Sequence, residues 1–444
     1  MPPVLRPLLA LALLLATSTL AAQGPAEAPA PAPEARASLL PDQPRWSAKG
    51  QGGFPRFVLG EDSIYVRHED ALKRLDLADG SEFWSLPLEG VPLREEDGLL
   101  FMLTPKHEVA CVEARTGAVL WRTAVEKEGE ANFGRGNVVV VQEGFKGPVL
   151  AGDRVLIGTF GGAFLKGRTG KLYALDRKDG KLLWSFEAED GVEAAPLIHK
   201  ELALIGGVAA CYGIDLATGR QVWKAKVRSD NQWQFKLEGD TLLVSSGHYG
   251  SQQSMFGGTL YALDAATGRE RWTYDICGPS ILKVAGDRLV GIEWGSFGGT
   301  RLSCLGLADG KKVWELKEKG TAWPVVHEGR AVFLSKENRA HVVDVASGRP
   351  VAALPATGDF QMGFLKGPWS RFLDPLVVQG RAVVGSWDKA RKESILQILD
   401  LQGGKVAEER RFPGEIYGLW DRRGFLLALL RGSDDTYTFQ VYGR

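Results

Sequence analysis

Few residues in this chain have the type and spacing that catalysis requires. Ser245, Ser246 and His248 lie close together, but no G-x-S-x-G motif surrounds either serine and no acidic partner can be assigned. A serine-hydrolase site is therefore the weaker interpretation, and we predict no catalytic residue. Gly161-Gly162 and Gly257-Gly258 do not precede a predicted helix, so they lack the helix N-terminus that makes a phosphate site.

Metal and redox chemistry also lack a recognisable pattern. The chain has four cysteines and six histidines, with no CxxC pair and no cluster at zinc spacing. Cys111 and Cys304 stand at positions that Ala174 and Ala262 occupy in other copies of the repeat described below, so we expect them to fill the core. We predict no metal site and no bound cofactor.

Composition excludes several classes of protein. The chain has 444 residues, 54 Lys and Arg balance 54 Asp and Glu, and 44% of the residues are hydrophobic. A neutral chain lacks the surplus of positive charge that attracts phosphate, so we do not expect a nucleic-acid binder. The 55 glycines and 13 tryptophans suggest many turns between short strands, which favours an all-β fold.

The N-terminal residues predict export. In residues 1–22 one charge, Arg6, precedes the apolar run Leu8–Leu15 and a stretch of small residues, the order of a cleaved signal peptide. The apolar run is shorter than the roughly 20 residues that cross a bilayer, so we expect a protein that does not span the membrane. No cysteine for lipid attachment precedes Cys111. We therefore expect a periplasmic or secreted protein.

Two further segments follow the predicted signal peptide. Residues 23–44 are rich in Ala, Pro and Glu and lack aromatic and β-branched side chains, which predicts an extended linker. We place a single folded domain at residues 45–444.

A repeat fills that domain. The pattern Leu-Asp-x-x-[Thr/Asp]-Gly-x-x-x-Trp occurs, for example, from Leu175 to Trp184, and eight copies of its turn recur about every 46 residues. The Asp carboxylate holds a tight turn and the Gly supplies a positive φ, so each copy predicts a hairpin. Two more short strands precede each hairpin. Four strands per unit around a ring predict a β-propeller, because that arrangement limits exposed sheet edges.

These residues resemble the tryptophan-docking repeats of the PQQ-like, or quinoprotein-type, β-propellers. That group includes quinoprotein alcohol dehydrogenases and BamB-like outer-membrane assembly factors, and the resemblance covers nearly everything from Arg45 onward. In the family the tryptophan packs against the neighbouring blade. The resemblance therefore implies structural rather than ligand-binding roles for Trp84, Trp121, Trp184, Trp223, Trp272 and Trp314.

The number of blades stays open between eight and nine. Eight is usual for the family, and eight complete units run from Phe54 to about Phe412. Residues 416–442 supply three further strands, and the segment around Trp46 resembles the outer strand around Trp223. The N-terminal segment is therefore expected to close the ring as the fourth strand of a ninth unit.

The insertions of the repeat fall on one face of the predicted ring. Turns after the first and third strands are short, whereas several loops after the second strands are long, at residues 159–166, 247–256, 293–297 and 386–391. Long links between units lie at residues 126–146 and 356–371 on the same face. Rigid scaffolds commonly carry function on such loops. We expect this face to bind a partner through Phe160, Tyr249, Phe256, Trp294, Phe297 and Trp387.

Three functions are compatible with this prediction. Similarity to the BamB-like members implies a non-enzymatic scaffold that helps assemble outer-membrane proteins or holds another protein partner in the cell envelope, and we favour this function. Similarity to the quinoprotein dehydrogenases implies PQQ and Ca²⁺, often beside adjacent cysteines, but the chain has no such pair and no assignable Ca²⁺ cluster. Binding of a glycan or small molecule is the third alternative.

Overall fold

The computed structural model describes most of the chain after residue 37. The described residues are 38–50, 57–68, 71–104, 108–125, 147–159, 170–189, 191–192, 194–207, 209–227, 231–251, 254–277, 282–294, 300–317, 324–335, 337–358, 375–431 and 437–443. Within these ranges, no helix has the length and apolar character that crossing a membrane requires. The compact unit formed by this part of the chain runs from Leu39 to Arg444.

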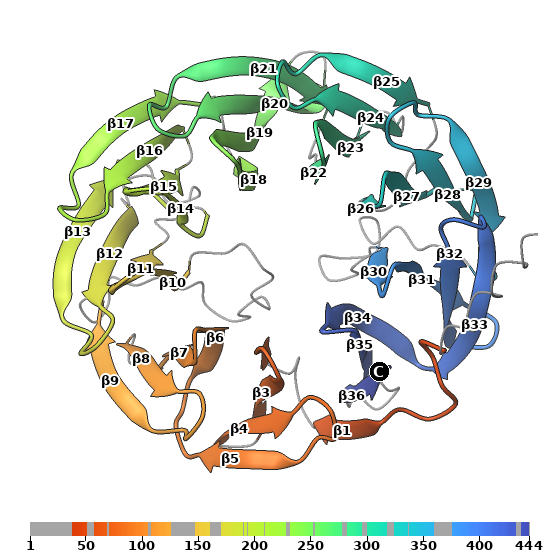
Figure 1. The fold of residues 1–444 in the computed structure, drawn as a ribbon, viewed down its shortest axis with the longest axis horizontal. Helices are drawn as coiled ribbons and strands as arrows, with labels where there is room; N and C mark the ends of the chain where they lie inside the picture. Colours follow the sequence, from red (N-terminus) through yellow and green to blue (C-terminus); the bar gives the residue numbers. More distant parts are fainter. Residues whose placement is uncertain are drawn as a thin grey trace, which may run out of the picture. The chain divides into compact units, whose positions relative to one another are not determined.

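Nine four-stranded antiparallel sheets follow one another around a ring in this unit (Figure 1). In each sheet the first strand lies nearest the centre and the fourth lies at the rim. The all-β propeller predicted from the repeat is confirmed, and the number of blades is nine.

The first four blades each take four consecutive strands. Blade 1 has β2 (Phe57–Leu59), β3 (Ser63–His68), β4 (Ala71–Asp76) and β5 (Glu82–Leu86). Blade 2 has β6 (Val91–Glu96), β7 (Leu99–Leu103), β8 (Glu108–Glu113) and β9 (Val119–Ala124). Blade 3 has β10 (Val149–Ala151), β11 (Arg154–Gly158), β12 (Gly170–Asp176) and β13 (Leu182–Ala188). Blade 4 has β14 (Leu197–His199), β15 (Leu202–Gly206), β16 (Ala210–Asp215) and β17 (Gln221–Lys226).

The next four blades follow the same rule. Blade 5 has β18 (Asn231–Glu238), β19 (Thr241–Ser251), β20 (Ser254–Asp264) and β21 (Glu270–Cys277). Blade 6 has β22 (Leu282–Ala285), β23 (Arg288–Trp294), β24 (Thr300–Gly306) and β25 (Lys312–Leu316). Blade 7 has β26 (Val325–His327), β27 (Arg330–Leu334), β28 (Arg339–Asp344) and β29 (Pro350–Pro355). Blade 8 has β30 (Leu376–Val378), β31 (Arg381–Asp388), β32 (Glu393–Asp400) and β33 (Lys405–Pro413).

Blade 9 joins the two ends of the chain. Its first three strands are β34 (Glu415–Arg422), β35 (Phe425–Arg431) and β36 (Tyr437–Tyr442), and its fourth is β1 (Trp46–Gly50). β1 pairs antiparallel with β36, with Trp46 opposite Val441. The predicted closure of the ring by the N-terminal strand is therefore confirmed.

The turn of the repeat shows why its residue types recur. In blade 5, Asp264 accepts hydrogen bonds from the backbone N and the Oγ1 of Thr267, at 3.0 and 2.8 Å. Gly268 has a φ of 70° and donates its N–H to the Asp264 carbonyl. Arg271 lies 2.7 Å from the carboxylate, and chiefly this hydrogen bond lowers the pKa of Asp264 to about 2.

The core is divided among the junctions between blades. Each junction has a cluster of buried residues from two adjacent blades, and the junction of blades 9 and 1 has two such clusters. Between blades 3 and 4, for example, Leu172 and Ala174 pack with Ala203 and Tyr212. Each blade is therefore stabilised mainly by its neighbours, as in other repeat architectures.

Candidate binding face

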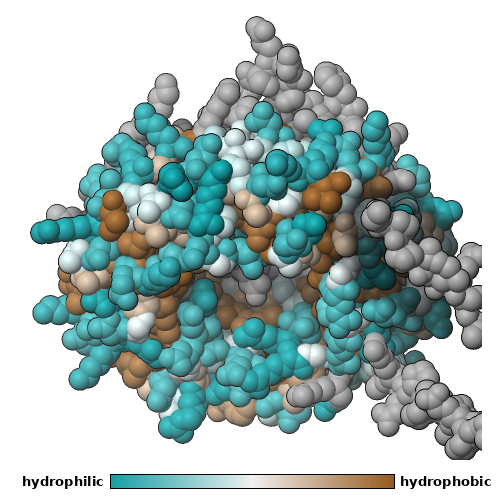
Figure 2. Space-filling model, turned by 45° about the horizontal axis from the view of Figure 1, so that its top comes forward, coloured by the Kyte–Doolittle hydropathy of each residue, from teal (hydrophilic) through white to brown (hydrophobic). Residues whose placement is uncertain are grey.

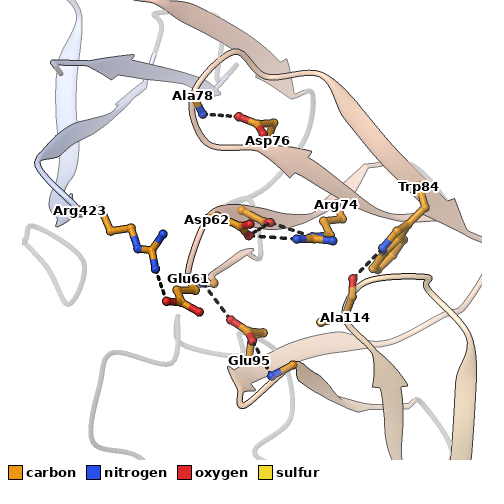
Figure 3. A network of polar contacts seen from close by, with 12 residues as sticks. Glu61, Asp62, Arg74, Asp76, Ala78, Trp84, Glu95, Ala114 and Arg423 are labelled. Atoms are coloured by element: carbon orange, nitrogen blue, oxygen red, sulfur yellow. Dashed lines mark hydrogen bonds and ion pairs between the residues drawn. The ribbon is translucent and has the colours of Figure 1, made fainter.

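The indole nitrogens of the repeat tryptophans donate hydrogen bonds within the protein. Each Nε1 donates a hydrogen bond to a backbone carbonyl of the next blade, as Figure 3 shows for Trp84 and Ala114. The pairs and their N···O distances are Trp84 to Ala114 (2.9 Å), Trp121 to Arg177 (2.9 Å), Trp184 to Leu216 (3.0 Å), Trp223 to Ala265 (3.2 Å), Trp272 to Leu307 (3.0 Å) and Trp314 to Val345 (2.8 Å). Trp46 of β1 makes the same contact with Leu77 of blade 1 at 3.0 Å.

Each indole also lies against the glycine of the next blade's repeat turn. A Cβ placed on Gly268 would lie 2.4 Å from Cε3 of Trp223, which is too close for any side chain at this position. The glycine is thus required both for its positive φ and for the approach of the ring.

The short turns carry polar contacts between blades (Figure 3). Arg423 in the first turn of blade 9 forms an ion pair with Glu61 of blade 1. The Glu61 N–H donates to Glu95 Oε2 of blade 2 at 2.9 Å. Within blade 1, Arg74 pairs with Asp62 at 3.0 Å, and a hydrogen bond from Ser63 chiefly lowers the pKa of Asp62. Such exposed pairs contribute modestly to stability, but here they link three successive blades.

For five of the six predicted partner-binding residues, the structure describes either the backbone alone or neither backbone nor side chain. Phe160 and Phe297 lie outside the described residues. Tyr249, Phe256 and Trp294 have described backbones only, in β19, β20 and β23. Tyr249 is the cross-strand neighbour of Phe256.

Three of the expected loops are partly strand, which corrects the prediction. β19 continues to Ser251 and β20 begins at Ser254, so the segment expected as a loop at 247–256 is mainly a long hairpin. β23 and β31 likewise extend to Trp294 and Asp388. The cause is continued ladder pairing, since Tyr249 still pairs with Phe256 and Trp294 with Thr300.

Trp387 is the predicted binding residue whose surroundings are described most fully. Its side chain is half-buried near the end of β31, and its backbone lies opposite Ser394. A Cβ on Gly358 would lie 2.9 Å from the carbonyl carbon and oxygen of Trp387, so the link that leaves blade 7 passes directly against it.

Charged groups lie next to Trp387 in the sequence and across the ladder, on the opposite face of the sheet. Arg411 Nη1 lies 3.0 Å from Asp388 Oδ2 and 3.4 Å from Glu393 Oε2. A backbone hydrogen bond from Arg391, followed by the Arg411 contact, lowers the pKa of Asp388. The turn at residues 389–392 is exposed and carries three basic side chains. A half-buried aromatic side chain directly before an exposed basic turn has the composition of a protein-binding centre.

A second surface feature was missed by sequence reasoning. Among the described residues, the most exposed large hydrophobic ones lie on fourth strands at the rim, most of them directly before the tryptophan position. They are 41–55% exposed: Phe83, Leu120, Leu182, Leu183, Val222, Val313 and Val351. Figure 2 shows hydrophobic residues as separate groups in a largely hydrophilic surface. The signal was present as an apolar residue before most repeat tryptophans.

The residues with catalytic potential occupy structural positions. Cys111 and Cys304 are fully buried, and burial raises the pKa of their thiols to about 12 and about 11. Ser245 and Ser246 are buried in β19, where Ser246 Oγ donates to the Thr259 carbonyl. Within the described ranges, no group of three or more His, Cys, Asp or Glu side chains is arranged to hold a metal ion.

Comparison with protein families gives one match over most of the chain. The family model described as "Outer membrane protein assembly factor BamB" matches residues 67–146, 106–280 and 207–426.

Two groups of curated proteins are similar at comparable identity. Quinohemoprotein alcohol dehydrogenase ADH IIB of Pseudomonas putida is 25% identical over 329 residues, which are 60% of this chain and 44% of that protein. Outer membrane protein assembly factor BamB of Yersinia pestis is 24% identical over 300 residues, 64% of this chain and 67% of that protein. The chain thus spans less than half the length of the dehydrogenase.

Solved structures include the same two kinds of protein. BamB from Moraxella catarrhalis aligns with a TM-score of 0.46 and 18% identity, covering 80% of this chain and 96% of that one. A europium-containing methanol dehydrogenase aligns with a TM-score of 0.48 and 12% identity, covering 90% of this chain and 76% of that one.

Proposed function

Since the chain belongs to the PQQ-like propeller family whose model is described as outer membrane protein assembly factor BamB, we propose that it is a non-enzymatic binding or assembly propeller of the cell envelope. The observation that carries this proposal is the family match from residue 67 to residue 426. The BamB of Yersinia pestis adds support, because the match covers 67% of that protein. The predicted signal peptide favours a periplasmic or secreted location.

The partner would bind on the face that carries the loops after the second strands. On the opposite face, the short turns near the ends of the chain are engaged in contacts such as Arg423 with Glu61. Trp387 offers a half-buried aromatic anchor, and the exposed basic turn at residues 389–392 follows it directly in the chain. Anchors of this kind carry a large share of the binding energy in protein interfaces. Phe160, Tyr249, Phe256, Trp294 and Phe297 remain predicted members of the same surface.

The test is affinity capture of envelope proteins with the full chain, followed by binding measurements with the captured partner. Trp387→Ala is expected to weaken binding by at least about tenfold, the usual effect of losing a central aromatic anchor. Val222→Ala, at a side chain 55% exposed on the rim, is the control and should leave binding unchanged. If Trp387→Ala lowers the melting temperature by several degrees while binding persists, the tryptophan caps its own loop and the interface lies elsewhere.

The alternative function is that of a PQQ-dependent dehydrogenase, which the similarity to the Pseudomonas putida enzyme supports. The described residues do not fit that cofactor set, since their buried cysteines are not adjacent and no described carboxylate cluster is suited to Ca²⁺. Titration of the full chain with PQQ and Ca²⁺, monitored by dye reduction with an alcohol, separates the two functions. Saturable PQQ binding with Ca²⁺-dependent reduction would favour the enzyme and overturn the proposal.

A further inference from the structure

Two junctions depart from the tryptophan contact that joins the other blades. In blade 5, Trp272 stands opposite Ala262, directly before a register shift. The same register position holds Ala352 in blade 7 and Glu408 in blade 8. A glutamate therefore occupies, at the junction of blades 8 and 9, the place where most blades carry an indole.

The Glu408 carboxylate is bound by an arginine side chain of blade 8 and by backbone N–H groups of the N-terminal segment. Its Oε1 lies 2.8 Å from Nη1 of Arg381, whose side chain is only 7% exposed. The backbone N–H of Leu39 donates to both carboxylate oxygens, at 3.2 and 3.1 Å, and that of Leu40 donates to Oε2 at 3.3 Å. A partly buried carboxylate needs such donors, because desolvation of an unpaired charge is costly.

The segment that supplies these N–H groups is itself buried. Leu39 is 1% exposed and Leu40 is 7% exposed, although sequence analysis placed both in the linker. They pack in one cluster with residues of blade 8, such as Phe412, and of blade 9, such as Tyr442.

Arg410, two residues after Glu408 on the same face of β33, binds carbonyl oxygens of the same segment. Its guanidinium donates to the carbonyl oxygens of Leu40 and Asp42. It also lies 5.3 Å from the ring centroids of Phe412 and Tyr442. Backbone donors and acceptors of the segment are thus both bound by side chains of β33.

The topology of blade 9 explains why blade 8 carries a glutamate at the position where most blades carry a tryptophan. Elsewhere the tryptophan contacts the turn between the third and fourth strands of the next blade, but in blade 9 these strands are the two ends of the chain, β36 and β1. A turn that could accept an indole is therefore missing at this one junction. A carboxylate, in contrast, can bind the backbone N–H groups of an extended segment.

We propose that the junction of blades 8 and 9 is a peptide-docking site whose occupant is this chain's own Leu39–Asp42 segment. Glu408 and Arg410 bind its backbone, and Leu39 and Leu40 fill the apolar cluster. The segment closes the ring independently of the β1–β36 ladder. The functional propeller therefore begins at Leu39, and the linker ends before it.

Hydrogen exchange of the unmodified full chain tests the docking directly. The amides of Leu39 and Leu40 are expected to exchange at least about tenfold more slowly than unstructured amides, since each donates to a charged acceptor. Exchange at the unprotected rate would overturn the proposal without any variant being made.

A matched pair of substitutions on β33 tests the role of Glu408. Glu408→Gln removes the charge and should raise exchange at Leu39 and Leu40 by roughly tenfold, together with faster proteolysis within residues 38–44. Glu409→Gln removes the neighbouring charge, whose carboxylate contacts Gln397 and Thr357 instead, and should leave both readouts unchanged. Equal effects of the two substitutions would overturn the assignment. Protection that depends on protein concentration would show that the segment docks on a second copy, which also contradicts docking within one chain.

Discussion

The junctions that join blades 1 to 7 are packed differently from the two junctions that blade 8 makes with its neighbours. From Trp84 to Trp314, an indole spans the gap to the next blade, stacks on a glycine and donates to a carbonyl. On the two sides of blade 8 the same register position carries Ala352 and Glu408. The comparison shows that the repeat position is an inter-blade connector whose residue type depends on what the next blade presents.

The two exceptions differ from each other as well. At the junction of blades 7 and 8, the outer strands β29 and β33 contact each other, and a Cβ on Gly404 would lie 3.0 Å from the Cβ of Ala352. A small residue is accommodated there because the strands approach. At the junction of blades 8 and 9, blade 9 has no turn between its third and fourth strands that β33 could contact. The Leu39–Asp42 segment contacts Glu408 and Arg410 of β33 there instead.

The largest expected effect comes from removing a docked indole. Trp223→Ala should lower the free energy of unfolding by about 3–5 kcal/mol, because it leaves a cavity at a residue only 7% exposed and an unpaired carbonyl at Ala265. Urea unfolding measures the change. Val222→Ala, on the same strand and 55% exposed, should change stability by less than about 0.5 kcal/mol. Similar losses for the two variants would contradict a specific docking role.

A smaller effect is expected from restoring the missing tryptophan. Ala352→Trp should destabilise the protein by about 1–3 kcal/mol, since β29 and β33 are already in contact and leave no room for an indole. Thermal unfolding provides the measurement, with Val351→Trp at the exposed neighbouring position as control. A rise in stability would show that the junction of blades 7 and 8 retains the space found at the other junctions.

The smallest expected effect concerns the acid stability of a repeat turn. The pKa of Asp264 is lowered from 3.8 to about 2, chiefly by the hydrogen bond from Arg271. A lowered pKa in the folded state contributes stability above the unfolded pKa, and this contribution is lost as the pH falls from about 4 through 2. Asp264→Asn should therefore be less stable than the unmodified protein at neutral pH. The expected loss is only roughly 0.5–1 kcal/mol, because solvent screens the pair of Asp264 and Arg271.

Urea unfolding between pH 5 and pH 2 checks this prediction. The stability difference between Asp264→Asn and the unmodified protein should narrow steadily toward the acid end. A difference that is constant with pH would mean that the side chain acts by its turn hydrogen bonds alone and that its charge contributes nothing.

Local chemistry was sufficient to predict the blades. The Asp and Gly of each turn, such as Asp264 and Gly268, specify a hairpin through side-chain acceptance and positive φ, and both properties are visible in the residue types. The likeness of the Trp46 segment to an outer strand predicted closure of the ring for the same reason. The candidate binding residues were chosen from loop length, a weaker signal, and strand pairing extended into those loops where the ladder could continue.

Only the tertiary structure decided what lies at the junction of blades 8 and 9. Glu408, Leu39 and Leu40 are far apart in the sequence, and neither the charge of the glutamate nor the Pro-rich surroundings of the leucines indicates burial. They meet because ring closure brings the first and last parts of the chain together, which leaves one blade without the turn that an indole needs. The repeat thus determined each blade locally, whereas contacts between distant segments depend on the closed ring and had no local signature.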